Sequence, residues 1–183
     1  MPLVVLGLSG ALTHDPSAAI YIDGQLVAAA EEERFTRQKH AKHAMPLHAS
    51  RYCLKEAGLK PKDVDVVAFP FAKTSIFGKA RWHYARRYWY APERAIDALF
   101  NGNRHYRRNV KKVQELVSQL GINWPDIQFD AVEHHIAHAS SAYHLSGFEG
   151  KVAILGIDGK GEYATTFFGY GEEGRIHKIK EFY

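Results

Sequence analysis

Two histidines four residues apart, His134 and His138, stand in the stretch EHHIAHASSAYHLSGF (133–148), with His135 between them. On a helix this spacing places both imidazoles on one face, about 5–6 Å apart at Cβ, which suits two ligands of one metal ion. A third candidate ligand, Asp158, ends the apolar run VAILGI (152–157). Two imidazoles and a carboxylate form a mixed nitrogen and oxygen site that fits Fe, Zn or Mn and leaves positions open for substrate. The pair alone is a weak signal, because ordinary surface or core histidines also fall at this spacing.

The surroundings of the pair favour a site. The run IQFDAVE (127–133) predicts a strand that ends just before the histidines, and α/β proteins keep their sites at the carboxyl ends of strands. The predicted helix is rich in alanine and serine, and these small side chains permit other parts of the site to approach the helix closely. We expect the strand that ends at Asp158 to lie beside the strand 127–133, so that the carboxylate reaches the imidazoles.

The turn DGKGE (158–162) resembles a phosphate-binding turn. An aspartate followed by glycines lets backbone N–H groups point at a phosphate while the carboxylate holds a cation. This interpretation makes Gly159 and Gly161 candidate nucleotide-binding residues. The alternative is a plain hairpin turn.

A second polar pair, His14 and Asp15, follows the first apolar run of the chain. The histidine is a candidate general base near neutral pH, and Asp15 would orient it or cap the next turn. The alternative is an Asx-turn before Pro16. We expect this stretch and the histidine helix to belong to one site.

The elements that must position these residues follow from apolar runs and turn residues. Asp23-Gly24 separates two β-type runs and predicts a type I′ hairpin, so the chain opens with a three-stranded meander. Pro46 opens a predicted helix that Gly58 ends, and a longer helical stretch at 92–119 breaks near residues 101–103. The predicted strands span residues 3–9, 17–22, 25–31, 64–71, 127–133 and 151–159, and two more flank residues 172–174. This order predicts an α/β domain with a duplicated core, unless the two meanders repeat by chance.

Composition narrows the class of protein. The chain has 183 residues and one cysteine, so no internal disulfide can form, and we expect a cytoplasmic protein. No apolar run reaches the roughly 18 residues that a membrane span needs, and the N-terminus lacks the features of a signal peptide. The net charge is +4.

Much of the positive charge lies in residues 79–112, where lysine and arginine alternate with aromatic residues. Such a mixture suits a nucleic-acid surface. We favour a solvated basic helix pair whose aromatics pack inward. A docking surface for an anionic small molecule or a partner domain is a third alternative.

The chain resembles a known family at three motifs in the right order. These are LGLSG with THDPSAAIYIDGQLVAAAEEERFTRQKH, then HHIAHASSAYHLSGF, then VAILGIDGKGE. Together they strongly resemble the N-terminal half of the O-carbamoyltransferases of antibiotic and nodulation-factor biosynthesis. The resemblance covers residues 3–58 and 127–183, and the basic segment between them is not diagnostic.

The resemblance implies an α/β fold of the actin-like ATPase (ribonuclease H-like) type, a mixed sheet with flanking helices. It implies a first lobe at about 1–150, the start of a second repeat at about 151–183, and an incomplete second lobe. A C-terminal domain of such proteins makes carbamoyl-adenylate from carbamoyl phosphate and ATP, and the actin-like domain transfers the carbamoyl group to a hydroxyl of a small-molecule acceptor. Without that domain and the second lobe we expect the chain to be inactive alone.

Residue roles follow from the same resemblance. The family's metal ligands match His134, His138 and Asp158, with iron as the expected metal, and its catalytic base matches His14. Lys39 faces the nucleotide or acceptor, unless it is a solvated loop lysine. Two rival hypotheses remain, a non-catalytic metal- or nucleotide-binding module and a nucleic-acid-associated relative of the tRNA threonylcarbamoyl-transfer proteins.

Overall fold

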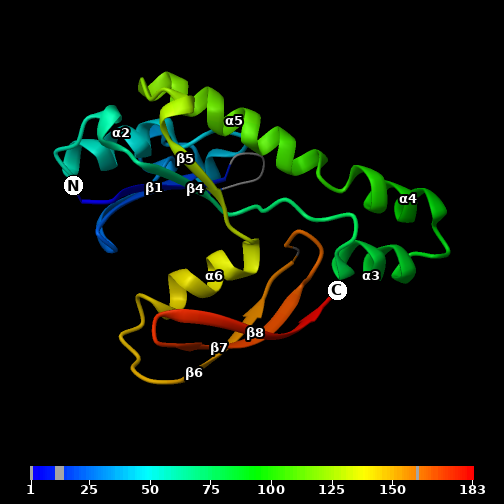
Figure 1. Ribbon diagram of the computed structural model, residues 1–183. Helices are drawn as coiled ribbons and strands as arrows, with labels where there is room; N and C mark the ends of the chain where they lie inside the picture. Colours follow the sequence, from blue (N-terminus) through cyan, green and yellow to red (C-terminus); the bar gives the residue numbers. More distant parts are fainter. Residues whose placement is uncertain (1, 11–14, 160) are drawn as a thin grey trace. The chain divides into compact units, whose positions relative to one another are not determined.

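The computed structural model describes residues 2–10, 15–159 and 161–183. The chain divides into two compact units, each with a β-sheet of its own (Figure 1). The first unit comprises Met1–Pro70 and Arg107–Ala131, and the second comprises Phe71–Tyr106 and Val132–Tyr183. The expected boundary near residue 150 between a first lobe and a second repeat stays a prediction.

The first unit is built on a five-stranded mixed sheet with the strand order β3-β2-β1-β4-β5. The meander β1-β2-β3 is antiparallel, while β4 and β5 join it in parallel. Asp23 and Gly24 both have positive φ, +48° and +80°, which confirms the predicted hairpin turn. The strands are β1 (Val4–Ser9), β2 (Ser17–Ile22), β3 (Gln25–Glu31), β4 (Val66–Phe69) and β5 (Gln128–Ala131).

Two helices form the apolar core of this unit with the sheet. Helix α2 (Leu47–Glu56) packs on β2 and β3, where the Cys53 thiol donates a hydrogen bond to the Ala18 carbonyl at 3.4 Å. Helix α5 (Arg104–Leu120) buries the predicted apolar stripe around Val113 and Leu116. Shorter helical turns are α1 (Glu33–Thr36), η1 (Lys39–Ala41), η2 (Pro61–Asp63) and η3 (Trp124–Asp126).

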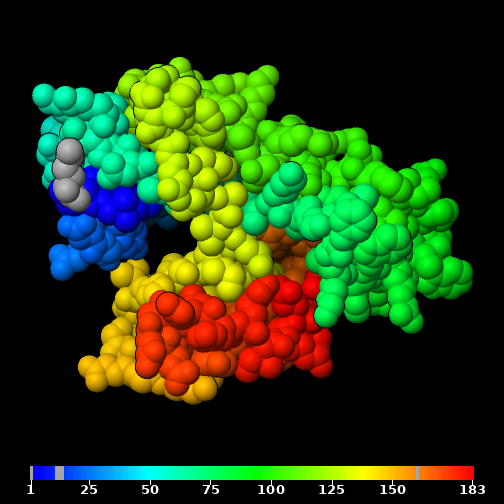
Figure 2. Space-filling view, viewed as in Figure 1, coloured from blue at the N-terminus to red at the C-terminus, as the bar shows by residue number. Residues whose placement is uncertain are grey.

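The second unit contains the predicted second meander, an antiparallel sheet of order β6-β7-β8. Its second turn again uses two residues with positive φ, Glu173 at +49° and Gly174 at +72°. Helix α6 (His134–Tyr143) packs on this sheet, and β8 is exposed along most of its length, as the red segment in Figure 2 shows. The strands are β6 (Val152–Ile157), β7 (Thr166–Glu172) and β8 (Arg175–Phe182).

One expectation about strand order is wrong. The strand that ends at Asp158 does not lie beside the strand that precedes the histidines, because β5 pairs with β4 in one sheet and β6 pairs with β7 in the other. The expectation followed the rule that consecutive strands are usually neighbours. That rule holds here for β6 and β7, which are antiparallel partners, and not for β5 and β6. The candidate ligands therefore meet because α6 packs on β6, and not because two strand ends are adjacent.

The basic segment forms α3 (Lys79–Arg87) and α4 (Pro92–Asn101), which pack on each other. The predicted break near residue 102 is confirmed. Arg81 is buried, and its guanidinium donates hydrogen bonds to the carbonyls of Leu99 at 2.6 Å and Thr74 at 2.8 Å. This basic residue therefore has a structural role.

The expectation that the aromatics of the basic segment pack inward is wrong for four of them. Trp82, Trp89, Tyr90 and Phe100 are 56–79% exposed. Trp89 and Tyr90 lie in the turn between α3 and α4, so neither falls on a buried helix face. Within the described ranges, no helix combines the length and the apolar character that a membrane crossing needs.

Candidate metal centre

Helix α6 and the loop after β6 bring the three predicted ligands together. His134 Nε2 lies 2.7 Å from Asp158 Oδ2, and His138 Nε2 lies 3.1 Å from His134 Nε2 and 3.7 Å from the same carboxylate oxygen. All three ligand atoms lie within 4.8 Å of one another. The i, i+4 spacing therefore places both rings on the helix face that meets Asp158.

The arrangement fits one divalent ion. Ligand atoms that each bind a metal at about 2.0–2.2 Å lie on the order of 3 Å apart, close to the separations of these three atoms. Two imidazole nitrogens and one carboxylate oxygen suit iron, zinc or manganese, and the positions that they leave open can take oxygen atoms of a substrate. The assignment of these residues as metal ligands stays a prediction.

The surroundings of Asp158 lower the pKa of its carboxyl group and so favour the anionic form. Burial raises the pKa of this carboxyl group, but hydrogen bonds from His134 and the Gly159 N–H, together with the charges of His134 and His138, hold the pKa below its usual value. The Gly159 N–H lies 2.6 Å from Asp158 Oδ1. At neutral pH the group is therefore an anion, with Oδ2 aimed at the histidines.

Exposure and packing differ between the two histidines. The His134 side chain is 19% exposed and its ring lies 5.1 Å from the Phe71 ring, whereas the His138 side chain is 59% exposed. The backbone N–H of Asp158 donates to the Thr165 carbonyl at 2.9 Å, which fixes the start of the loop after β6. The centre thus has a packed side at His134 and an open side at His138.

The glycines of the DGKGE turn make contacts within their own loop. Besides the Gly159 N–H on Asp158, the Gly161 N–H donates to the Ala164 carbonyl at 2.8 Å. A Cβ atom at Gly161 would lie 3.1 Å from His135 Cε1, so a side chain there would crowd that ring. Nucleotide binding by Gly159 and Gly161 stays a prediction, and so does the role of Lys39, which is exposed in η1.

Asp15, in the first unit, contacts a histidine that the sequence analysis did not single out. Asp15 Oδ1 lies 2.8 Å from His40 Nδ1, the Asp15 N–H donates to the His40 carbonyl at 3.0 Å, and Glu33 accepts the His40 N–H at 2.8 Å. His40 closes the ERFTRQKH motif, and that position was the available signal. His14 lies outside the described residues, and a single site shared by this stretch and the histidine helix stays a prediction.

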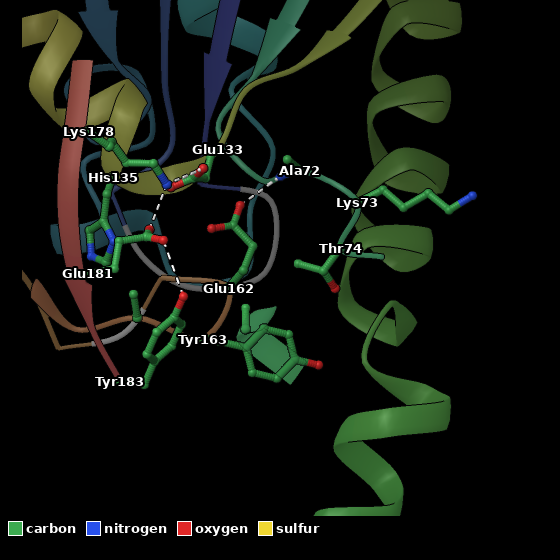
Figure 3. Close-up of a pocket in the computed structure, with 12 residues that line it drawn as sticks. Ala72, Lys73, Thr74, Glu133, His135, Glu162, Tyr163, Lys178, Glu181 and Tyr183 are labelled. Atoms are coloured by element: carbon green, nitrogen blue, oxygen red, sulfur yellow. Dashed lines mark hydrogen bonds and ion pairs between the residues drawn. The ribbon is translucent and has the colours of Figure 1, made fainter. Parts of the chain in front are cut away.

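A second polar cluster of the second unit was missed entirely. Ligand atoms of Glu133, His135 and Glu181 lie within 4.8 Å of one another. The Lys178 ammonium already lies among them, 2.6 and 2.7 Å from the Glu133 oxygens and 2.6 Å from Glu181 (Figure 3). Burial raises the pKa of Glu133. Burial alone would lower the pKa of Lys178, but the hydrogen bonds and charges of Glu133 and Glu181 have the larger effect, so the pKa of Lys178 is raised. We interpret this cluster as a network of ion pairs within the protein, because the Lys178 ammonium lies where a metal ion would have to bind.

Solved structures similar to this chain show its fold. YeaZ from Pseudomonas aeruginosa superposes with a TM-score of 0.50 and 20% sequence identity over 97% of this chain and 65% of that one. A second structure, described as an uncharacterized protein with similarity to peptidase YEAZ from Pseudomonas aeruginosa, gives the same TM-score. With its mixed sheet and flanking helices, the chain has the predicted α/β actin-like ATPase fold.

Sequence relatives then show the family. The family described as Carbamoyltransferase N-terminus matches residues 4–182, and the chain belongs to it. The chain is 31% identical to the nodulation protein NolNO of Sinorhizobium fredii over 199 residues and 35% identical to the uncharacterized protein sll1178 of Synechocystis sp. over 179 residues. It covers only 26% and 28% of these two proteins, so it spans about a quarter of their length.

Proposed function

We propose that this chain is the N-terminal part of a metal-assisted O-carbamoyltransferase. The observation that carries the proposal is the convergence of His134, His138 and Asp158 in a chain of the carbamoyltransferase family. The reaction joins a carbamoyl group to a hydroxyl of a small-molecule acceptor. The donor is carbamoyl-adenylate, made from carbamoyl phosphate and ATP by a C-terminal domain of the longer protein.

The metal would be held by His134 Nε2, His138 Nε2 and Asp158 Oδ2, the three atoms that converge. Iron is the metal we expect, with zinc or manganese as alternatives that the donor set also accepts. A divalent ion supplies positive charge that neutralises phosphate oxygens and stabilises the leaving AMP. The open side at His138 is where those oxygens would enter.

The chain's other residues handle the proton and the substrates. The acceptor oxygen attacks the carbamoyl carbon, the bond to the adenylate oxygen breaks, and His14 takes the hydroxyl proton as general base. Asp15, Lys39, Gly159 and Gly161 contact the nucleotide or the acceptor. Support for these roles comes from the family motifs in which the residues stand.

Metal analysis and turnover of the complete protein test the proposal together. We expect one equivalent of a divalent metal, and release of AMP when carbamoyl phosphate, ATP and a hydroxyl acceptor are added. His138→Ala should remove the metal and abolish carbamoyl transfer. His144→Ala is the matched control, because His144 caps the C-terminal end of the same helix and is exposed.

Two outcomes would contradict the proposal in different ways. Stoichiometric metal in His138→Ala would remove the three residues as the metal centre. Metal retention without AMP release across a broad panel of hydroxyl compounds would favour the rival hypothesis of a non-catalytic metal-binding module.

A further inference from the structure

The candidate ligand His134 is the first residue of α6. The backbone N–H groups of a first helical turn have no partner within the helix and need acceptors from elsewhere. The residue before the helix, Glu133, provides no side-chain cap. The position of His134 therefore depends on what holds the start of the helix.

Glu162 supplies the missing acceptor. Its Oε1 and Oε2 accept the His134 N–H at 3.1 and 3.3 Å, and Oε1 also accepts the Ala72 N–H at 2.8 Å. A carboxylate at a helix N-terminus is favoured by the helix dipole, and hydrogen bonds to a charged acceptor are stronger than neutral ones. The contact therefore resists displacement of the helix start.

The loop that contains Glu162 also contains the acidic candidate ligand, Asp158. Asp158 and Glu162 lie on the connection between β6 and β7, and both contact His134. Asp158 holds the imidazole through Nε2, and Glu162 holds the backbone of the same residue. A single loop thus fixes one histidine at both ends relative to the carboxylate ligand.

We propose that Glu162 is a positioning residue of the metal centre, holding His134, and through the helix His138, in register with Asp158. The inference rests on the proposed metal centre. Among the described residues, the group that could hold an ion at this place is His134, His138 and Asp158, and it does not include Glu162. Glu162 therefore acts on the metal through a ligand's backbone, as outer hydrogen-bond partners of metal sites do.

Glu133 offers a matched comparison at the same helix end. It is also a glutamate beside His134, but its carboxylate binds Lys178, and Lys178 also binds Glu181 (Figure 3). In the same view Glu162 is joined to Ala72 and stands apart from that network. A change at Glu133 alters the charge at the helix start and leaves the acceptor of the His134 N–H in place.

The test measures Co²⁺ affinity by chelator competition, and the visible absorption of bound Co²⁺, in the intact protein. We expect Glu162→Ala to weaken Co²⁺ binding by about 10–100-fold, as loss of an outer partner does, and to shift the absorption bands. Glu162→Gln keeps an acceptor oxygen and loses the charge, so we expect a smaller loss, of about three- to tenfold. Glu133→Gln should bind Co²⁺ like the wild type.

The outcomes separate this inference from the proposed function. Wild-type Co²⁺ affinity and spectrum in Glu162→Ala would overturn the positioning role and leave the metal centre standing. If Glu162→Ala does not fold, Glu162→Gln decides, and wild-type affinity there overturns the role. An equal loss in Glu133→Gln would also overturn the role, because it would show that any change of charge at the helix start weakens the site. A wild-type protein that binds no Co²⁺ would overturn the metal centre and the inference with it.

Discussion

The two meanders begin alike and then differ where the chemistry is expected. The first strand of the first meander ends in LGLSG (6–10), and the first strand of the second leads into LGIDG (155–159). Ser9 holds the place in the first pattern that Asp158 holds in the second. Ser9 still pairs with Ser17 in its sheet, whereas Asp158 lies one residue beyond β6 with its carboxylate on His134. A similar sequence pattern at the end of a strand thus carries a hydroxyl in one unit and a candidate cation ligand in the other.

The strands themselves also differ in surroundings. β1 lies between β2 and β4, and Leu6 and Leu8 are 0% and 3% exposed. β6 ends its sheet, and Leu155 and Ile157 are 57% and 74% exposed. The first strand of the first meander therefore belongs to the core of its unit, while the first strand of the second meander leaves Leu155 and Ile157 exposed.

The largest effect should come from making the second pattern like the first. Asp158→Ser removes the carboxylate among the three candidate ligands, so we expect metal affinity to fall by more than the roughly 10–100-fold that loss of an outer partner costs. Carbamoyl transfer should be abolished. Ser9→Asp is the control and should bind no additional metal in equilibrium dialysis. Undiminished metal in Asp158→Ser would break the comparison.

The next effect concerns His14, which follows the first pattern in the sequence. If His14 acts as a general base and not as a metal ligand, His14→Asn should slow carbamoyl transfer by about 10²–10⁴-fold, the usual contribution of a general base. Metal content and carbamoyl-adenylate formation should remain at wild-type levels. Single-turnover assays with preformed donor would measure the transfer step, and an unchanged rate would remove His14 from this role.

A smaller effect distinguishes the two glycines of the shared pattern. A Cβ at Gly156 would lie 2.4 Å from Cε1 of Phe167, which is fully buried, whereas at Gly7 the nearest atom is the Ala19 carbonyl oxygen at 3.8 Å. Gly156→Ala should destabilise the protein by about 1–3 kcal/mol through overpacking. Gly7→Ala should change the free energy of unfolding by less than about 1 kcal/mol, since an added methyl meets ordinary contact there. Urea unfolding measures both, and equal values would contradict the difference in packing.

The smallest effect is a pH dependence that arises next to the second meander. His135 is 1% exposed, and among the described residues its Nε2 has no hydrogen-bond partner. By contrast, the buried Glu32 beside the first meander has a partner, because it accepts the Ala49 N–H at 2.9 Å. Burial, and then the charge of His134, lowers the pKa of His135. Between that lowered pKa and the unfolded value of about 6.5, the unfolded state binds more protons, so stability is lost as the pH falls.

Replacement of this histidine should therefore flatten the stability profile. We expect His135→Leu to lose less stability than the wild type between pH 8 and pH 5, measured by urea unfolding at each pH. His144→Leu, on the exposed end of the same helix, should keep the wild-type slope. Parallel curves for the wild type and His135→Leu would show that His135 does not titrate differently on unfolding.

Local patterns predicted most of the fold and part of the site. The turn at Asp23-Gly24, the break near Gly102 and the facing pair of His134 and His138 each depend on neighbours in the chain, and all were confirmed as geometry. The expectation that β5 and β6 are neighbours was wrong because β5 pairs with the preceding strand β4 and β6 with the following strand β7, and apolar runs alone do not show which of its neighbours along the chain a strand pairs with. The hydrogen bonds to Glu162 were missed because their donors are backbone N–H groups, which every residue type except proline has.

The exposed position of β6 has a consequence for handling the protein. β6 is the last strand of its sheet, so one row of its backbone N–H and C=O groups faces away from β7. An open strand edge beside apolar side chains is a template on which another polypeptide can add a strand. In concentrated preparations, we therefore expect the open edge of β6 to be one of the places where this chain self-associates, together with the opposite edge of the sheet at β8.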